Sequence, residues 1–429
     1  MNIDQLYQLF LTCGKVCTDT RNIIPGSIFF ALKGETFDGN TYAHEALKKG
    51  AKYAVVDNPE IHGENILYIN NVLLALQDLA ALHRQKSSAV IIGITGTNGK
   101  TTTKELVSAV LSAQKKIIFT QGNLNNHIGV PLTLLTIQKE TEYAVIEMGA
   151  NHPGEIDFLC NIADPDYGLI TNVGKAHLEG FGSFEGVVST KTELYRYLHA
   201  RNRKAFVNNE NNILFSKANK DHDIFYGSDV SAIVSGKVVK NNPFIEIEWC
   251  GKDFVVYSCA THLIGNYNFE NILAAITIGS YFGLDALKIN QALEAYVPSN
   301  HRSQLVKTEK NEILLDAYNA NPSSMRVAIE NFKQIERTDK VMILGDMFEL
   351  GLESPIEHKA VLSRLEELKD VTVLLAGKNY LEFAGSFDYH FFKTTSELKD
   401  YLILHPVQNS FKLVKGSRGM KMEQVLDVL

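Results

Sequence analysis

The order of hydrophobic and polar residues in the first part of the chain predicts a small unit of strands and helices. Short apolar runs over 27–32 and 54–57 are typical of strands, and glycines separate them. Over 72–84, apolar residues recur at helical spacing, which predicts a helix with one apolar face against a neighbour. The polar residues 85–88 that follow indicate a linker.

The middle of the chain begins with a pattern typical of a buried parallel strand. A continuous apolar run starts at Ala89 and meets a glycine-rich turn, which a helical segment follows. Residues 143–146 and 167–170 are further predicted strands, and 271–281 is a predicted helix. Pro298 and its polar neighbours mark a second boundary.

Beyond that boundary, predicted strands alternate with helical segments, as in a domain built of βαβ units. The strands are expected at 313–315, 341–344, 371–375 and 411–414. We therefore predict an α/β protein of three domains.

The three predicted domains differ in size and in kind. Residues 1–85 form a small α/β domain, and residues 86–299 form a central domain with a mostly parallel sheet. Residues 300–429 form a C-terminal, Rossmann-like α/β domain.

Composition narrows the class of protein. The 429 residues are 45% hydrophobic and carry a formal net charge of -7, which argues against a broad surface for nucleic acid. The N-terminus has no signal-peptide pattern, and no stretch approaches the length of a membrane span. Five cysteines without CxxC spacing fit a reducing compartment. We expect a cytoplasmic protein that binds no nucleic acid.

The most informative motif is a variant P-loop between an apolar strand and a helix. Its glycines let backbone N–H groups approach phosphate, Lys100 supplies a cation, and Thr101 offers a hydroxyl to Mg²⁺. A glycine is expected five positions before Gly99, at Ile94, but it stands at Gly93. The predicted phosphate-binding residues are Gly96, Thr97, Asn98, Gly99, Lys100, Thr101 and Thr102. By itself the loop fits a GTPase, a transporter ATPase, a kinase or a ligase.

The Gly-x-Thr-Gly-Thr-Asn-Gly-Lys-Thr-Thr form of this loop resembles that of Mur ligases and folylpolyglutamate synthases. Further blocks of the chain agree with the resemblance, and they lie at 122–131, 147–156, 171–179, 191–194, 268–271, 316–322 and 345–347. The N-terminal block from Asp19 to Gly39 resembles the UDP-sugar-binding domain of later Mur ligases, which folylpolyglutamate synthases lack. The resemblance thus favours a Mur ligase.

The resemblance implies that ATP phosphorylates a substrate carboxylate and that an amine attacks the acyl phosphate to form an amide. Two Mg²⁺ ions would offset the repulsion between the negative groups. Glu147 ends the strand 143–146, where it can face Thr101 across one ion, although a strand-end glutamate alone is usually just solvated. His177 resembles the ligand of the second ion, although chemistry alone would make it a core histidine, because Mg²⁺ prefers oxygen.

Lys191 matches the lysine that becomes carbamylated in Mur ligases. A lysine near cations is disfavoured as ammonium, and the neutral amine can add CO₂ to become an anion that helps to hold the metals. Without the resemblance, Lys191 is an ordinary lysine on a helix surface, and Thr190 departs from the usual small residue before it.

The resemblance also assigns the remaining contacts of ATP. Asn268 and Asn271 would lie by the adenine, Arg302 would contact phosphate and Asp316 would bind the ribose. These residues come from both sides of Pro298, so closure of the domains would complete the site. Each asparagine could instead cap a helix or a turn. The predicted catalytic residues are Lys100, His177, Lys191 and Arg302.

Two blocks of the third domain, 318–325 and 345–351, look like the dipeptide-adding members of the family. Diamino-acid-adding members usually carry Asp-Tyr-Ala-His-Thr-Pro and a third-domain Asp-Asn-Pro-Arg, whereas the Asp-Asn-Pro here is at 57–59 and precedes Glu60. The implied substrates are UDP-N-acetylmuramoyl-tripeptide, ending in lysine or diaminopimelate, and D-alanyl-D-alanine. Their predicted contacts are Asp19, Thr20, Arg21, Lys33, Asp38, Asn125, Asn126, Tyr318, Asn319 and Asn321. The alternatives are a diamino-acid-adding ligase and a P-loop NTPase switch, and we expect a monomer.

Overall fold

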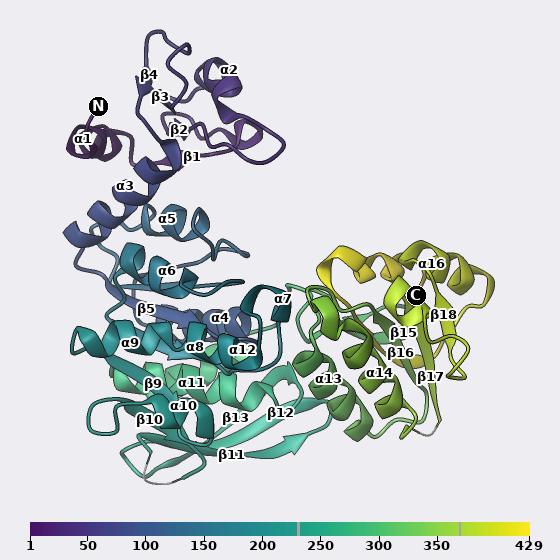
Figure 1. Cartoon of the computed structure of the whole chain (residues 1–429). Coiled ribbons are helices and arrows are strands. Elements are labelled where there is room, and N and C mark those ends of the chain that lie inside the picture. The colour runs from purple at the N-terminus through teal and green to yellow at the C-terminus, as the bar shows by residue number, and fades with distance from the viewer. Residues whose placement is uncertain (230–231, 369) are drawn as a thin grey trace.

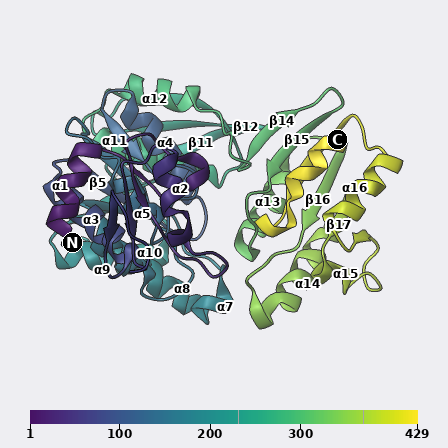
Figure 2. The same cartoon turned by 90° about the horizontal axis from the view of Figure 1, so that it is seen from above.

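Three β-sheets with helices packed against them organise the chain in a computed structural model that describes residues 1–229, 232–368 and 370–429. The sheets follow one another along the chain, as the colours of Figure 1 show. The first lies above the central one in that view, and the third lies beside it. Figure 2, seen from above, separates the third domain from the other two, which overlap there. The predicted α/β class with three domains is confirmed.

The first sheet has four parallel strands in the order β1-β2-β3-β4. Its strands are β1 (Val16–Cys17), β2 (Ile28–Phe30), β3 (Tyr53–Val56) and β4 (Ile66–Tyr68). Its helices are α1 (Ile3–Cys13) and α2 (Ala43–Lys48), with 3₁₀ turns η1 (Thr20–Asn22) and η2 (Gly39–Tyr42). The predicted strands 27–32 and 54–57 correspond to β2 and β3.

Helix α3 (Val72–Lys86) joins the first sheet to the central domain. The side chain of Asn71 accepts a hydrogen bond from Leu74 N and begins the helix. The predicted linker 85–88 is wrong in its first half, because α3 continues through Lys86. Buried Arg84 explains the continuation, since its guanidinium donates to backbone oxygens of the central domain and pairs with Asp166 (2.8 Å). One hydrophobic core spans both units, with Leu76 of α3 packed in it, so the boundary at 85/86 stays a prediction.

The central sheet has nine strands in the order β13-β12-β11-β10-β9-β8-β5-β7-β6. Its strands are β5 (Val90–Thr95), β6 (Ile117–Phe119), β7 (Tyr143–Glu147), β8 (Tyr167–Ile170), β9 (Lys204–Asn208), β10 (Ile224–Gly227), β11 (Val234–Asn241), β12 (Phe244–Cys250) and β13 (Val256–Ile264). Neighbouring strands from β6 to β11 pair in parallel, as predicted. Strands β11, β12 and β13 pair antiparallel. The sequence interpretation missed this extension. Buried positions alternate along β12, as expected for a sheet that is covered on one face only.

Helices cover both faces of the parallel part of this sheet. They are α4 (Lys100–Ser112), α5 (Gly129–Leu134), α6 (Glu155–Ala163), α7 (Leu178–Phe181), α8 (Phe184–Lys191), α9 (Glu193–Ala200), α10 (Asn212–Lys217), α11 (Asn268–Tyr281) and α12 (Ala286–Ala295). Ile91 of β5 packs with α5, α6 and α9, whereas Ile92 and Ile94 pack with α4, α11 and α12. Because both faces are covered, β5 is apolar up to its last residue, Thr95, and the P-loop follows directly from the core.

The third sheet has six strands in the order β14-β15-β19-β16-β17-β18. Its strands are β14 (Gln304–Lys307), β15 (Asn311–Asp316), β16 (Lys340–Gly345), β17 (Val371–Ala376), β18 (His390–Phe392) and β19 (Ser410–Lys415). Its helices are α13 (Pro322–Gln334), α14 (Ser354–Leu365), α15 (Lys378–Leu381) and α16 (Thr395–Leu404), with turns η3 (Gly351–Glu353), η4 (Arg418–Met420) and η5 (Met422–Val428). The four predicted strands correspond to β15, β16, β17 and β19, and the sequence interpretation missed β14 and β18. The boundary at 299/300 stays a prediction.

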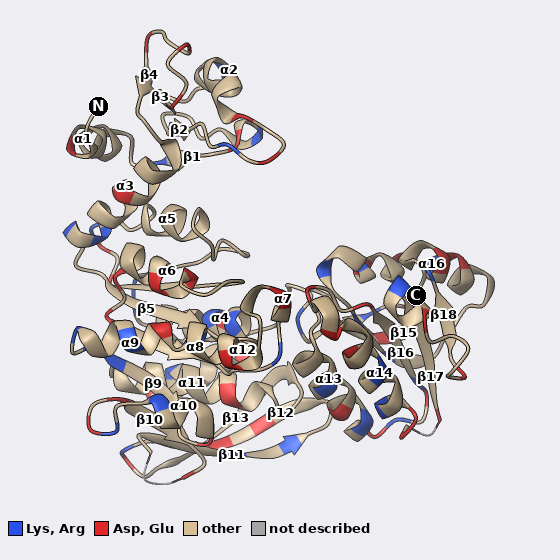
Figure 3. Cartoon of the chain, viewed as in Figure 1, with Lys and Arg blue, Asp and Glu red and all other residues tan. Residues whose placement is uncertain are grey.

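Charged residues of both signs are spread over the three domains, as Figure 3 shows. The five cysteines are free thiols. Within the described residues, no helix has the length and apolar character needed to cross a membrane.

Candidate active site between the central and third domains

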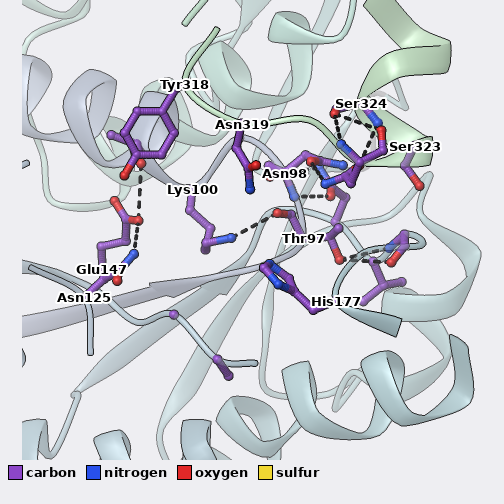
Figure 4. A pocket seen from close by; sticks show the side chains of 18 of the residues that line it. Thr97, Asn98, Lys100, Asn125, Glu147, His177, Tyr318, Asn319, Ser323 and Ser324 are labelled. Carbon is purple, nitrogen blue, oxygen red and sulfur yellow. Dashed lines mark hydrogen bonds between the residues drawn. The ribbon is translucent and has the colours of Figure 1, made fainter. Parts of the chain in front are cut away.

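A cavity of about 1420 Å³ opens where the third domain meets the P-loop. The central domain contributes the loop, Glu147, Asn268 and Asn271 to its wall. The third domain contributes Arg302, Asp316, Tyr318, Asn319, Asn321 and Lys415. Figure 4 shows side chains of both domains gathered around this space, with Lys100 and Glu147 from one and Tyr318 and Asn319 from the other. The predicted nucleotide residues on both sides of Pro298 thus face a common space.

The P-loop turns tightly between β5 and α4. Gly99 has a φ of +77°, and a Cβ atom there would lie 2.7 Å from Asn271 Oδ1, so only glycine fits without displacement. Lys100 Nζ donates to the backbone oxygens of Gly96 (2.7 Å) and Thr97 (3.0 Å). Burial lowers the pKa of Lys100 to about 8, although the charge of Glu147 opposes the shift. Lys100 is therefore mainly a cation at pH 7.

The segment after β8 holds the loop in place. Asn98 N donates to Asn172 Oδ1 (3.0 Å), and Gly174 N donates to Thr97 Oγ1 (3.0 Å). These contacts explain why the block 171–179 belongs with the P-loop, because it supports the loop from a neighbouring strand end.

Glu147 and Thr101 have the chemistry of a Mg²⁺ site. The Glu147 side chain is 1% exposed, and its Oε1 accepts from Thr101 Oγ1 (3.2 Å) and Asn125 Nδ2 (2.7 Å). Glu147 Oε2 is buried and has no hydrogen-bond partner among the described residues. A buried carboxylate oxygen without a donor is costly unless a cation compensates it, and Mg²⁺ prefers carboxylate and hydroxyl oxygens. These residues therefore fit one Mg²⁺ ion.

His177 lies against the third domain. It precedes α7 with a φ of +49°, and its Nδ1 is 2.5 Å from Glu349 Oε2. The close contact with His177 lowers the pKa of Glu349. In the part of the chain that the structure describes, no three His, Cys, Asp or Glu side chains gather as a metal cluster. The role of His177 at a second metal stays a prediction.

Lys191 is buried, contrary to what its sequence surroundings alone indicate. At the end of α8 it is 2% exposed, and its Nζ donates to Ala150 O (3.2 Å) and lies 5.3 Å from the ring centre of Phe181. Burial lowers the pKa of Lys191 well below its usual value, and the nearby charge of Lys100 adds to the shift. The neutral amine, which can react with CO₂, is thereby favoured.

The two asparagines of α11 connect that helix to its surroundings. Thr103 Oγ1 donates to Asn271 Oδ1 (2.9 Å), Asn271 Nδ2 donates to Asn268 Oδ1 (3.0 Å), and Asn268 Nδ2 donates to Ile264 O (2.9 Å). Both side chains line the cavity from the first turn of the helix, beside the P-loop.

Arg302 and Asp316 approach the cavity from the third domain. The Arg302 guanidinium carbon lies 3.6 Å from the ring centre of Tyr318. Asp316 Oδ2 accepts from Lys415 Nζ (2.5 Å), which also donates to Asn319 O (3.2 Å). The sequence interpretation missed Lys415, although its place at the end of an apolar strand was a signal for a site residue.

Direct contacts join the third domain to the P-loop region. Asn321 Nδ2 donates to Asn98 Oδ1 (2.8 Å), and Lys175 N donates to Ser323 Oγ (2.9 Å). Lys175 also pairs with Glu357 of α14 (2.7 Å). The Asn-Ala-Asn-Pro block therefore touches the nucleotide loop itself.

The predicted substrate residues of the first domain bond within that domain. Asp19 pairs with Arg21 (2.7 Å), and Lys33 pairs with Asp57 (2.9 Å). The other two are Thr20, whose backbone oxygen accepts from Lys49 Nζ, and Asp38, whose carboxylate accepts from Asn40. The cavity lining contains none of these predicted residues, so the structure does not bring them to the nucleotide loop.

Of the two predicted asparagines near α5, Asn125 contacts Glu147, and both line the cavity. Asn126 Oδ1 accepts from Ile128 N (3.1 Å) and Gly129 N (2.9 Å) at the start of α5. Asn126 thus also has a structural role.

Comparison with known proteins covers most of the chain. Three family models match it: the Mur ligase family catalytic domain at 14–84, the Mur ligase middle domain at 94–279, and the Mur ligase glutamate ligase domain at 301–418. A UDP-N-acetylmuramoyl-tripeptide–D-alanyl-D-alanine ligase of Bacillus subtilis is 35% identical, over 96% of this chain and 92% of the relative. The chain belongs to the Mur ligase family.

Solved structures of Mur ligases share the fold. A crystal structure of MurF from Acinetobacter baumannii matches with a TM-score of 0.85 and 32% identity, over 96% of this chain and 92% of that chain. A MurF ligase from Thermotoga maritima in complex with ADP matches with a TM-score of 0.84 and 26% identity, over 97% of each chain.

Proposed function

We propose that this Mur ligase uses ATP to join D-alanyl-D-alanine to UDP-N-acetylmuramoyl-tripeptide, in the synthesis of peptidoglycan precursors. The observation that carries the proposal is that the P-loop and the Tyr318 to Pro322 block of the third domain line the same cavity and are in contact. The relatives from Bacillus subtilis and Escherichia coli, each 35% identical over nearly the whole chain, are named for this reaction. The enzyme is an ADP-forming acid–D-amino-acid ligase.

ATP would bind between the two domains. The P-loop contacts the phosphates, Asn268 and Asn271 face the adenine, and Asp316 binds the ribose. Lys100 and Arg302 bring positive charge to the phosphates, where negative charge is redistributed as the phosphoryl group moves to the substrate carboxylate. The cavity receives these groups from both domains, which supports the assignment.

Thr101 and Glu147 would hold one Mg²⁺, and His177 with a carbamylated Lys191 would help to hold a second. Bound Mg²⁺ supplies positive charge that offsets the repulsion between ATP and the carboxylate. Burial lowers the pKa of Lys191 and so favours its neutral amine. This supports the carbamate, because CO₂ adds to an uncharged amine.

The two peptide substrates would enter from different domains. Asp19, Thr20, Arg21, Lys33 and Asp38 would bind the UDP-muramoyl part, with Asn125 and Asn126 nearer to the reacting carboxylate. Tyr318, Asn319 and Asn321 would bind the dipeptide, whose amine attacks the acyl phosphate. The five free cysteines fit a reducing compartment, so we place the enzyme in the cytoplasm, and we expect a monomer.

The test is the product itself. The enzyme is incubated with ATP, Mg²⁺ and a UDP-muramoyl dipeptide or tripeptide, together with D-alanyl-D-alanine, lysine or diaminopimelate, and the products are weighed by mass spectrometry. We expect the dipeptide to be added to the tripeptide, with phosphate release dependent on both. Efficient addition of a diamino acid to the UDP-muramoyl dipeptide would identify the neighbouring ligase. Equal ATP turnover without the amine acceptor would identify an NTPase switch.

A further inference from the structure

The linker between α12 and β14 carries Arg302 and is bound to the P-loop helix by one carboxylate. Glu105, in the second turn of α4, accepts a hydrogen bond from Tyr296 Oη (2.5 Å) at Oε2. Asn300 Nδ2 donates to both oxygens of the same carboxylate, at 2.9 and 2.8 Å. Glu105 thus contacts two points of the linker, although it is 191 positions from Tyr296 in the chain.

The backbone on either side of Arg302 has an unusual conformation. His301 has a φ of +58° and Ser303 a φ of +47°, in the left-handed region that residues with a Cβ atom rarely adopt. Such conformations persist only where surrounding contacts enforce them.

Contacts of the residues directly before and after Arg302 enforce this conformation. Ser303 Oγ and Tyr267 Oη are 2.7 Å apart, and Tyr318 N donates to His301 O (3.2 Å). The linker is therefore fixed to α4 before Arg302, and its residues directly before and after Arg302 are bound to Tyr318 and Tyr267.

The fixed linker directs Arg302 into the cavity. Its guanidinium carbon is 3.6 Å from the centre of the Tyr318 ring, which supports the flat face of the cation. Arg302 Nε is buried and has no hydrogen-bond partner among the described residues. Lys100 and Arg302 both line the cavity, so the two cations face the same space.

We propose that Glu105 is a positioning residue: by binding Tyr296 and Asn300, it fixes the linker to the P-loop helix and so places Arg302 at the phosphate end of the nucleotide site. Glu105 does not line the cavity, so its effect on the reaction passes through Arg302. The inference rests on the proposed ligase function, which supplies the role of Arg302.

A double-mutant cycle of kcat tests the inference, with Glu105→Ala, Arg302→Ala and the double variant. A displacement of a charged group by about 1 Å can lower a rate about 100-fold, so we expect Glu105→Ala to lower kcat between about 10-fold and 100-fold. In the Arg302→Ala background the same change should lower kcat by less than about threefold, because effects that pass through one residue do not multiply. Effects that multiply, or a normal kcat for Glu105→Ala, would overturn the inference.

Conservative variants separate positioning from a loss of folding. Glu105→Gln should keep most of the activity, since its carbonyl can accept from Tyr296 and its amide can donate to Asn300 Oδ1, which has no partner among the described residues. If Glu105→Ala does not fold, Asn300→Ala takes its place in the cycle, because Asn300 lies outside the helix. Glu140→Gln is the control and should behave as the parent enzyme, because Glu140 is exposed. A parent enzyme that forms no amide would refute the proposed function, whereas an active parent with a multiplicative cycle would refute only the role of Glu105.

Discussion

Gly99→Ala tests how tightly the P-loop is fitted to α11. The new Cβ would lie 2.7 Å from Asn271 Oδ1 and 3.2 Å from its Nδ2, so Asn271 must move. Asn271 is held by hydrogen bonds to Thr103 and Asn268, each worth about 1 kcal/mol. The left-handed φ of +77° costs a further 1 kcal/mol or so for alanine. The expected destabilisation of the folded state is thus about 3 kcal/mol.

Gly283→Ala is the matched control. Its φ of +74° is nearly the same, but no atom lies within 4 Å of the position of its Cβ. It should therefore lose only the conformational part, about 1 kcal/mol. The difference between the two variants, about 2 kcal/mol, isolates the steric conflict with Asn271.

Urea unfolding and calorimetric binding of ADP are the assays. Because Asn271 lines the cavity, its displacement should weaken ADP binding by about fivefold, which corresponds to the loss of one hydrogen bond of about 1 kcal/mol, while Gly283→Ala binds normally. If Gly99→Ala unfolds at the same urea concentration as Gly283→Ala and binds ADP like the parent, Asn271 moves without a measurable cost in free energy. The close contact between Gly99 and Asn271 would then not stabilise the folded state.

Two further predictions concern buried lysines. Lys191→Ala should have a low turnover rate while it binds the UDP substrate normally, and a small carboxylate in the buffer should restore part of its activity. Lys191→Arg should lose as much activity, because arginine cannot form the carbamate. Full activity of Lys191→Arg in a product assay would exclude the carbamate. Burial lowers the pKa of Lys412 from 10.5 to about 8, so the unfolded chain binds more protons between these values and Lys412 should add about 3 kcal/mol to the rise of the free energy of unfolding over that range. Lys412→Met should make the rise smaller by this amount in urea titrations at pH 8 and pH 10.5, while the contributions of Lys100 and Lys191 stay. An unchanged rise would show that Lys412 does not contribute to it.

The sequence predicted those parts of the site that are encoded by neighbouring residues. The P-loop is one continuous motif between a strand and a helix, and the structure has β5 and α4 on either side of it. Glu147 was expected at a strand end and lies there, with Thr101 against its carboxylate. In both cases local spacing determines the geometry.

Contacts between distant positions were not predictable in this way. Lys191 follows a polar residue in a helix, so only its motif distinguishes it from a surface lysine, and its burial depends on Ala150 and Phe181. In the sequence, Glu105 has no feature that distinguishes it from other helical glutamates. Its contact with Tyr296 of the linker, 191 positions away, is visible only in the structure. The linker prediction at 85–88 was wrong in part for the same reason, because α3 is prolonged by contacts of Arg84 with distant residues.

Two of the polar contacts that hold the third domain against the P-loop region are weak. The hydrogen bond from Asn321 to Asn98 contributes about 1 kcal/mol. The pair of Lys175 with Glu357 contributes about 0 to 1 kcal/mol, because half of the lysine side chain is in water. The two contacts together contribute a free energy of about 1 to 2 kcal/mol. A ligand that binds more tightly to one arrangement of the domains than to another can supply a free-energy difference of this size. Because residues of both domains line the nucleotide cavity, ligands that bind there can supply the energy that fixes the domains for reaction. Weak contacts of this kind are therefore consistent with a site that is completed by its own substrates.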